Sequence, residues 1–157
     1  MTEQFTFFWN GPFSQWHLSD FTVNDITFNC AEQYMMYEKA MLFEDYDTAV
    51  KILETDAPRK QKALGRTVSN FDPDQWNKVA RDIVFAGNVA KFTQNDQLKE
   101  VLLETKGTTL VEASPYDKVW GIGLKQNDPR SLNRKTWRGT NWLGEVLTEV
   151  RDFLLLI

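Results

Sequence analysis

Residues 31–40 read Ala31-Glu32-Gln33-Tyr34-Met35-Met36-Tyr37-Glu38-Lys39-Ala40, and this stretch has the periodicity of a helix that continues to about Phe43. Tyr34, Tyr37 and Met41 are spaced i, i+3 and i+7, which places them along one stripe of the helix. Glu32 and Lys39 are seven positions apart, so they share a face and lie about 10 Å apart along the axis. Such a carboxylate and amine could grip a sugar-sized ligand from either side; the alternative is that both face water.

A second informative stretch lies some eighty residues further on and reads Ser114-Pro115-Tyr116-Asp117-Lys118-Val119-Trp120-Gly121-Ile122-Gly123. Asp117 supplies an acid. The indole of Trp120 stands beside glycines that let the backbone approach a ligand closely, an arrangement that suits stacking on a base. The Gly-x-Gly pair lacks the third glycine of a dinucleotide fingerprint, so a Rossmann interpretation is rejected. Together the two stretches are typical of a sugar or nucleotide pocket.

The length and composition indicate one globular domain over residues 1–157. A chain of this length buries about two-thirds of the surface that its unfolded form exposes, so it has enough core to fold alone. The aromatic content is 13%, with six Trp and eleven Phe, and most of these rings are expected in the core. A formal net charge of −4 argues against broad binding to nucleic-acid phosphates, although a local basic pocket is compatible with it.

Cysteine and histidine are scarce, which excludes two kinds of site. One cysteine cannot form an intramolecular disulfide, and one cysteine with one histidine cannot build a typical zinc site, so we expect no metal and no cofactor. The beginning of the chain lacks the features of a signal peptide, and the longest apolar run, residues 153–157, is too short to span a bilayer. We therefore expect a cytoplasmic protein with no membrane partner. The sequence leaves its oligomeric state open.

The rest of the pattern predicts a helix-rich α+β domain with a small β-sheet. Residues 5–9 and 21–28 read as strands of a small hairpin or meander, with a turn at Asn24-Asp25, and residues 110–113 read as a later strand. Further helices are expected at residues 47–54, 57–64, 72–92, 96–105 and from Asn141 to the end. In the second of these, Asp56 is the expected N-cap and Gly65 is expected just past the end. Residues 126–139 are predicted to be a polar surface loop and a candidate lid.

Several short motifs occur in an order that resembles one known family. They are Glu-x-Tyr-x-x-x-x-Lys-Ala, Leu-Gly-Arg, Lys-Phe, Leu-Val-Glu-Ala, Asp-x-x-Trp-Gly-x-Gly and Gly-x-Asn-x-Leu-Gly, between about Phe8 and Arg151. Each motif is weak alone, but the ordered set is similar to the YbiA-like, or NADAR, family. The resemblance implies a YbiA-like fold. It also implies an N-glycosidase that hydrolyses the C–N bond of riboflavin-pathway phosphoribosylamino-pyrimidine intermediates, or one that removes ADP-ribose from guanine in DNA.

This resemblance gives the candidate residues roles in a hydrolase. Breaking an N-glycosidic bond builds positive charge at the anomeric carbon, so one carboxylate must stabilise that cation or activate water while a proton reaches the base. Glu32 and Asp117 could divide this work, and the sequence leaves open which is the base. Lys39 would assist at the sugar, or form an imine with the opened sugar. The alternative class is a non-catalytic module that binds NAD or ADP-ribose.

The remaining predicted substrate contacts surround these groups. Arg66 could clamp a phosphate with its fork of donors, and the last helix begins at Asn141, where free backbone N–H groups would favour an anion. The full set of predicted contacts is Ser14, Gln15, Tyr34, Arg66, Glu112, Trp120, Gly121 and Asn141. The partner is expected to be a small nucleotide-like substrate, with ADP-ribosylated DNA as the larger alternative.

Two positions depart from the family pattern. The usual Phe-Ser-Asn-Phe is Phe13-Ser14-Gln15-Trp16 here, so that Gln15 keeps an amide but reaches farther. The common Glu-His-Tyr is Glu32-Gln33-Tyr34, which removes a possible histidine acid or base. His17 is the one remaining imidazole, and packing is the commoner role of a lone histidine. Both departures concern the residues that would set substrate preference.

Overall fold

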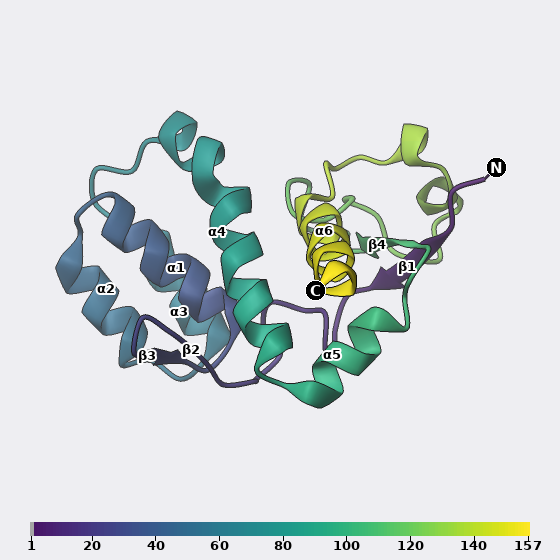
Figure 1. The fold of residues 1–157 in the computed structure, drawn as a ribbon. Coiled ribbons are helices and arrows are strands. Elements are labelled where there is room, and N and C mark those ends of the chain that lie inside the picture. The colour runs from purple at the N-terminus through teal and green to yellow at the C-terminus, as the bar shows by residue number, and fades with distance from the viewer. Residues whose placement is uncertain (1) are drawn as a thin grey trace. The chain divides into compact units, whose positions relative to one another are not determined.

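The computed structural model describes residues 2–157, and Figure 1 labels its strands and α-helices. The strands are β1 (Phe5–Phe8), β2 (Phe21–Val23), β3 (Ile26–Phe28) and β4 (Thr109–Glu112). The helices are α1 (Ala31–Leu42), α2 (Tyr46–Leu53), α3 (Pro58–Gly65), α4 (Pro73–Thr93), α5 (Asp96–Leu103), η1 (Pro129–Leu132), η2 (Arg134–Thr136) and α6 (Trp142–Leu156). The prediction of a helix-rich α+β fold is confirmed.

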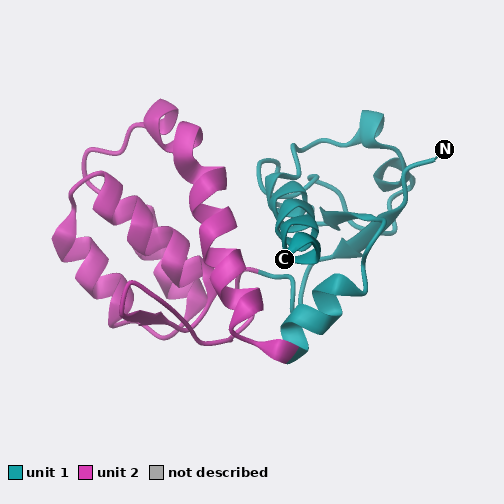
Figure 2. Cartoon of the chain, in the orientation of Figure 1, with its two compact units in different colours: residues 1–14, 97–157 teal, residues 15–96 magenta. Residues whose placement is uncertain are grey.

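Two compact units make up the chain (Figure 2). The terminal unit contains the residues up to Ser14 together with residues 97–157, and the central unit contains residues 15–96. A single domain over residues 1–157 stays a prediction from the sequence. Each unit has its own buried apolar cluster, and each carries part of the predicted site.

The terminal unit is built on a parallel pair of strands. Phe5 pairs with Thr109 and Phe8 with Glu112, and beyond the pair the N–H of Ala113 donates to the Phe8 carbonyl at 2.8 Å. Val111, Ile122 and Leu124 form a buried cluster. The expectation that the first strand joins residues 21–28 is wrong. Local turn signals favoured a neighbouring partner, whereas the actual partner is about a hundred residues away.

The central unit joins a hairpin to four helices. β2 and β3 are antiparallel, and the turn residues Asn24 and Asp25 both have positive φ, 50° and 65°, as a tight hairpin of this hand requires. The rings of Phe21, Phe28 and Tyr34 pack together, which fixes the hairpin on α1. The predicted turn and the predicted helix from Ala31 are confirmed.

Aspartates cap the helices α2 and α4, whereas the predicted ends of a third helix are displaced. Asp72 caps α4 by accepting from the N–H groups of residues 74 and 75, and Asp45 caps α2 through Thr48. At α3, however, the N-cap is Ala57 rather than Asp56, and Gly65 is the last helical residue rather than the one after it. Close packing favours glycine at this position, because an added Cβ would collide with the side chain of Met36.

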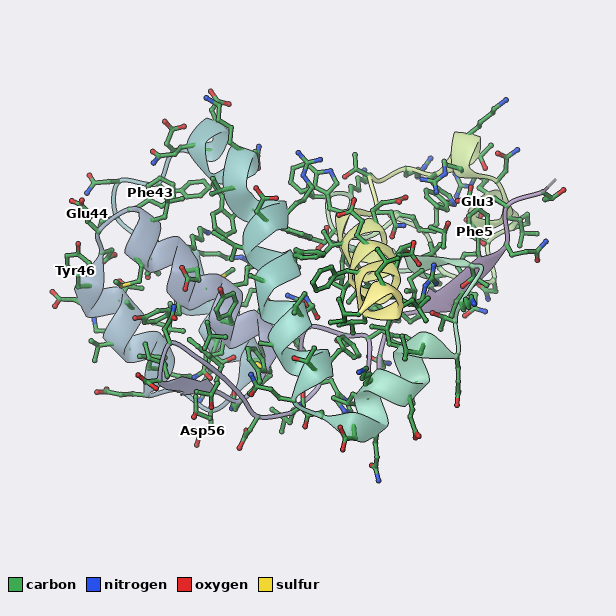
Figure 3. The ribbon with its side chains drawn as sticks, viewed as in Figure 1. Glu3, Phe5, Phe43, Glu44, Tyr46 and Asp56 are labelled. Carbon is green, nitrogen blue, oxygen red and sulfur yellow. The ribbon has the colours of Figure 1, made fainter. Side chains whose placement is uncertain are left out.

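The polar segment 126–139 is held at several points. The Ser131 hydroxyl donates to the Gln126 carbonyl at 2.9 Å, and the Trp137 indole N–H donates to the Ser131 carbonyl at 2.8 Å. Trp137 also packs on Phe5, and the Arg134 guanidinium pairs with the carboxylate of Glu3, which Figure 3 labels. Two short 3₁₀ helices lie in this segment, which the sequence analysis treated as irregular. Among residues 2–157 no helix is both long and apolar enough to cross a bilayer.

Gly144 allows α6 to approach β4 closely. A Cβ at this position would overlap the Leu110 carbonyl and the side-chain amide of Asn141. We predict that Gly144→Ala lowers the free energy of unfolding by about 1–3 kcal/mol, the usual cost of overpacking. Urea unfolding followed by circular dichroism measures this. Glu149→Ala, an exposed change on the same helix, is the control, and equal stability of the two variants would contradict the packing argument.

Candidate functional site

Glu32 is a buried carboxylate in the first turn of α1. Only 4% of it is exposed, and its N–H donates to the Gln15 carbonyl at 2.9 Å. Its Oε1 accepts a hydrogen bond from the indole N–H of Trp16 at 3.1 Å. The first turn of a helix favours a negative charge, because backbone N–H groups and the helix dipole point toward it. Glu32 is thus held in a fixed orientation by the segment that precedes the hairpin.

Lys39 lies further along α1 against aromatic rings. Its Nζ is 4.5 Å from the ring centroid of Phe71 and 5.9 Å from that of Trp76. Burial lowers the pKa of Lys39 below its ordinary value; the Glu32 charge opposes this shift, and the Arg66 charge adds to it. An amine in this setting deprotonates more readily than an exposed lysine.

Arg66 adds a second cation near Lys39. It is the C-cap of α3, and its side chain is exposed. Within residues 2–157 its guanidinium makes no hydrogen bond or ion pair with the protein. A further cation, the Nζ of Lys62, lies 6.0 Å from the ring centroid of Trp16. Lys39 and Arg66 are like charges that influence each other, and such a pair favours an anion such as a phosphate.

Other predicted contacts of the central unit are partly used inside the protein. The Gln15 Oε1 accepts from the Asn88 amide at 2.9 Å, which leaves its own amide nitrogen available. Tyr34 packs between Phe21 and Phe28, and burial raises the pKa of its hydroxyl to about 12. Asn88 is itself buried, and its Oδ1 has no hydrogen-bond partner among the described residues.

Gln33, which stands where the family commonly has histidine, has a structural role. Its amide nitrogen donates to the Ile52 carbonyl at 3.0 Å, near the end of α2. Its Oε1 accepts the N–H of Asn29 at 2.7 Å. The side chain therefore joins α1 to the end of α2 and is not directed at a ligand.

In the terminal unit, Asp117 organises the loop that carries Trp120. Its Oδ1 accepts the N–H groups of Val119 at 2.9 Å and Trp120 at 2.8 Å. The Ser114 hydroxyl accepts the N–H of Asp117 at 3.2 Å. The ring of Trp120 meets that of Trp142 edge to face, with centroids 5.5 Å apart. Among the described residues no group bonds to Asp117 Oδ2, which leaves one carboxylate oxygen available.

The beginning of α6 differs from the expectation of free N–H groups. The N–H groups of residues 140–143 donate to loop carbonyls at residues 118–121, at 2.9–3.1 Å. The expected anion site at this helix end is therefore wrong, because the loop already satisfies those donors. The packing of a loop on a helix end cannot be foreseen from the periodicity of the helix.

Asn141, Glu112 and Gly121 meet at the same place. Asn141 is fully buried, and its amide accepts the N–H of Glu112 at 2.9 Å and donates to the Leu110 carbonyl at 3.0 Å. Glu112 Oε2 is shielded from solvent, and a Cβ on Gly121 would lie 3.1 Å from it. Ser14 lies in the turn that follows β1, where its N–H donates to the Gly11 carbonyl at 2.9 Å. As ligand contacts these four residues stay predictions.

The structure thus groups Gln15, Glu32, Lys39 and Arg66 in the central unit. Glu112, Asp117, Trp120, Gly121 and Asn141 are grouped in the terminal unit. Among residues 2–157 no three His, Cys, Asp or Glu side chains gather as metal ligands.

Sequence reasoning missed three residues of the central group. These are Trp16, which donates to Glu32, and Phe71 and Trp76, which cover Lys39. Trp16 adjoins the predicted contact Gln15, and this proximity could have indicated it. Phe71 and Trp76 flank the start of α4, and no sequence signal connects them to a lysine on α1.

These features define a small α+β domain whose first long helix presents an oriented carboxylate and a desolvated amine near a free arginine. The family model described as NADAR domain matches residues 7–155. The chain belongs to the NADAR domain family.

Individual relatives agree with this assignment. The chain is 49% identical to N-glycosidase R617 of Acanthamoeba polyphaga mimivirus over 122 residues, covering 78% of this chain and 72% of that protein. It is 45% identical to Protein irg-1 of Caenorhabditis elegans over 131 residues, covering 82% of this chain but only 62% of that protein. The NMR structure of the E. coli protein YbiA matches with a TM-score of 0.80 and 26% identity, covering 99% of this chain and 88% of that one.

The pKa of Lys39 should respond to its two charged neighbours in opposite directions. Glu32→Gln removes a charge that favours the ammonium, so the pKa of Lys39 should fall further. Arg66→Met removes a repelling charge, so the pKa should rise. NMR titration of the ¹³C-dimethylated protein, with the Lys39 signal assigned by Lys39→Arg, measures both shifts. Shifts of the same sign would contradict the arrangement.

Proposed function

We propose that the chain is an N-glycosidase that hydrolyses the C–N bond between a base and a phosphoribosyl or ADP-ribosyl group. The observation that carries the proposal is the grouping on and around α1: a buried carboxylate held by the Trp16 N–H, a desolvated Lys39 and an Arg66 with no partner of its own. The N-glycosidase names of relatives such as R617 give it further support.

The chemistry needs one carboxylate at the anomeric carbon, and Glu32 has the required features. Its negative charge would stabilise the oxocarbenium-like transition state, and it would accept a proton from the attacking water. A C–O bond to water forms as the C–N bond breaks, and the bonding electron pair leaves with the base, which takes up a proton. Burial strengthens this electrostatic contribution, because less solvent screens the charge.

Lys39 and Arg66 would hold the phosphorylated sugar. Arg66 offers a planar fork of donors to a phosphate, and Lys39 offers either an ammonium beside the sugar or, when neutral, a nucleophile for the opened aldehyde. Because burial lowers the pKa of Lys39, its neutral form is more accessible than that of an exposed lysine, and both roles belong to the proposal.

The family motif around Asp117 and Trp120 supports a role for these two residues toward the base. Asp117 fixes the backbone of the Trp120 loop, and the indole of Trp120 offers a face for stacking. The free Oδ2 of Asp117 could also serve as the second carboxylate of the reaction. A double-variant test separates the two roles. If Glu32 and Asp117 act in the same step, Glu32→Gln with Asp117→Asn should lose little more rate than the worse single change.

The released base belongs to one of two classes. One is the aminopyrimidine of riboflavin-pathway intermediates, and the other is guanine carrying ADP-ribose. The net charge of −4 favours a free small metabolite over a nucleic acid, since an acidic protein repels a phosphate backbone. We therefore rank the phosphoribosyl metabolite first.

Mass spectrometry of released base and free sugar phosphate tests the proposal. The purified protein is offered phosphoribosylamino-pyrimidine intermediates, NAD and ADP-ribosylated guanine DNA. We predict turnover of one substrate and a fall in kcat of about 10²–10⁴-fold for Glu32→Gln, the range for loss of a general base.

Glu38→Gln is the matched control. Glu38 lies on α1 about 120° around the helix from Glu32, so the same chemical change on another face should leave the rate close to that of the unaltered protein. Turnover that Glu32→Gln leaves intact would overturn the assignment of Glu32. Tight binding of all ligands without any turnover would instead support a non-catalytic binding module.

A further inference from the structure

Trp9 and Tyr116 form an exposed aromatic pair in the terminal unit. Their ring centroids are 5.9 Å apart, and 45% of Trp9 and 82% of Tyr116 are exposed. Large rings gain free energy when buried, so an exposed pair of this kind marks a place where a ligand can cover it. Neither ring belongs to the groups assigned above.

A pocket with a volume of about 510 Å³ lies beside this pair. That size falls within the range of about 300–1,000 Å³ typical of small-molecule sites. Its lining residues are Phe8, Trp9, Ala113, Lys125, Gln126 and Asn127. The strands β1 and β4 are parallel and end at Phe8 and Glu112, so the pocket lies just beyond their carboxyl ends, where diverging segments commonly leave room for ligands.

The polar lining residues have unused hydrogen-bonding groups. The side chains of Lys125, Gln126 and Asn127 form no hydrogen bond or ion pair with the described residues. Two amides can each donate and accept, as the edge of a nucleobase requires. The lining includes the cation Lys125 and no carboxylate, so its positive charge complements a phosphate.

The walls of the pocket are fixed in place. The N–H of Asp128 donates to the Lys125 carbonyl at 3.1 Å, and the Ser131 hydroxyl holds the Gln126 carbonyl. On the other side, the Ser114 hydroxyl accepts the N–H of Tyr116 at 3.2 Å. A surface that is already ordered loses less entropy when a ligand binds.

We propose that this pocket binds the nucleobase of a phosphorylated nucleoside, which stacks on Trp9 while Gln126 or Asn127 contacts its edge and Lys125 contacts phosphate. The ring of Tyr116 supports Trp9 and extends the stacking surface. The pocket shares no residue with the proposed hydrolytic group, and binding here does not depend on hydrolysis.

Binding is measured by NMR on the Glu32→Gln protein, so that no turnover interferes. The assigned indole N–H signal of Trp9 is followed during titrations with AMP, ADP-ribose, ribose 5-phosphate and a single-stranded oligodeoxyadenylate. We expect AMP and ADP-ribose to shift this signal and ribose 5-phosphate, which has no base, to leave it nearly unchanged. A tighter response to the oligonucleotide than to AMP would identify single-stranded DNA as the source of the base.

Variants then test the stacking. Trp9→Ala should weaken AMP binding by about five- to a hundredfold, the range for loss of one base–aromatic stack, and Tyr116→Ala should weaken it by less. Because Trp9→Ala has no Trp9 signal, its affinity is read from the AMP resonances. Tyr46→Ala is the control, since Tyr46 is an exposed tyrosine on α2, labelled in Figure 3. Equal affinity for AMP in Trp9→Ala, or an equal response to ribose 5-phosphate, would overturn the proposal while leaving the proposed hydrolase untouched.

Discussion

The buried amide of Asn141 is the interaction on which the terminal unit depends. With one side chain and its own N–H, this residue contacts the Leu110 carbonyl, the Glu112 N–H and the Gly121 carbonyl. It has a left-handed backbone, with φ of 53°, which asparagine tolerates better than most residues. Strand β4, the Trp120 loop and the start of α6 are consequently fixed together. An aliphatic residue at this position would leave two buried backbone groups, the Leu110 carbonyl and the Glu112 N–H, without this partner.

The central unit buries charged groups, including the Glu32 carboxylate and, in part, the Lys39 amine. A carboxylate that is 4% exposed is costly unless it is bonded and close to positive charge. Glu32 accepts a hydrogen bond from the Trp16 indole N–H and lies in the first turn of α1. Its negative charge also attracts the ammonium of Lys39. Lys39 in turn lies against Phe71 and Trp76, which remove water from one side of it. Burial against these rings also lowers the pKa of Lys39 below its ordinary value.

Much of the fold could be predicted because its signals are local. The helix from Ala31, the Asn24-Asp25 turn and the helix expected at residues 72–92 each depend on neighbouring residues, and all three are confirmed. The parallel pairing of β1 with β4 could not be foreseen, since its register depends on contacts about a hundred residues apart. For the site, spacing on one helix identified Glu32 and Lys39 as a pair. The partners of that pair, Trp16, Phe71 and Trp76, lie outside α1, so residue spacing along α1 cannot identify them.

Gln33 has a consequence for how this protein responds to acid. Its amide bonds to the end of α2 and to Asn29 without any group that titrates, whereas an imidazole in the same place would change its hydrogen bonds between pH 5 and 8. The joint between α1 and α2 therefore keeps one arrangement across that range. This joint therefore adds no pH dependence to folding in that range, and acid acts on the fold at other contacts, such as the Asp45 cap of α2, where hydrogen bonds from Ser69 and Thr48 lower the pKa of the carboxyl.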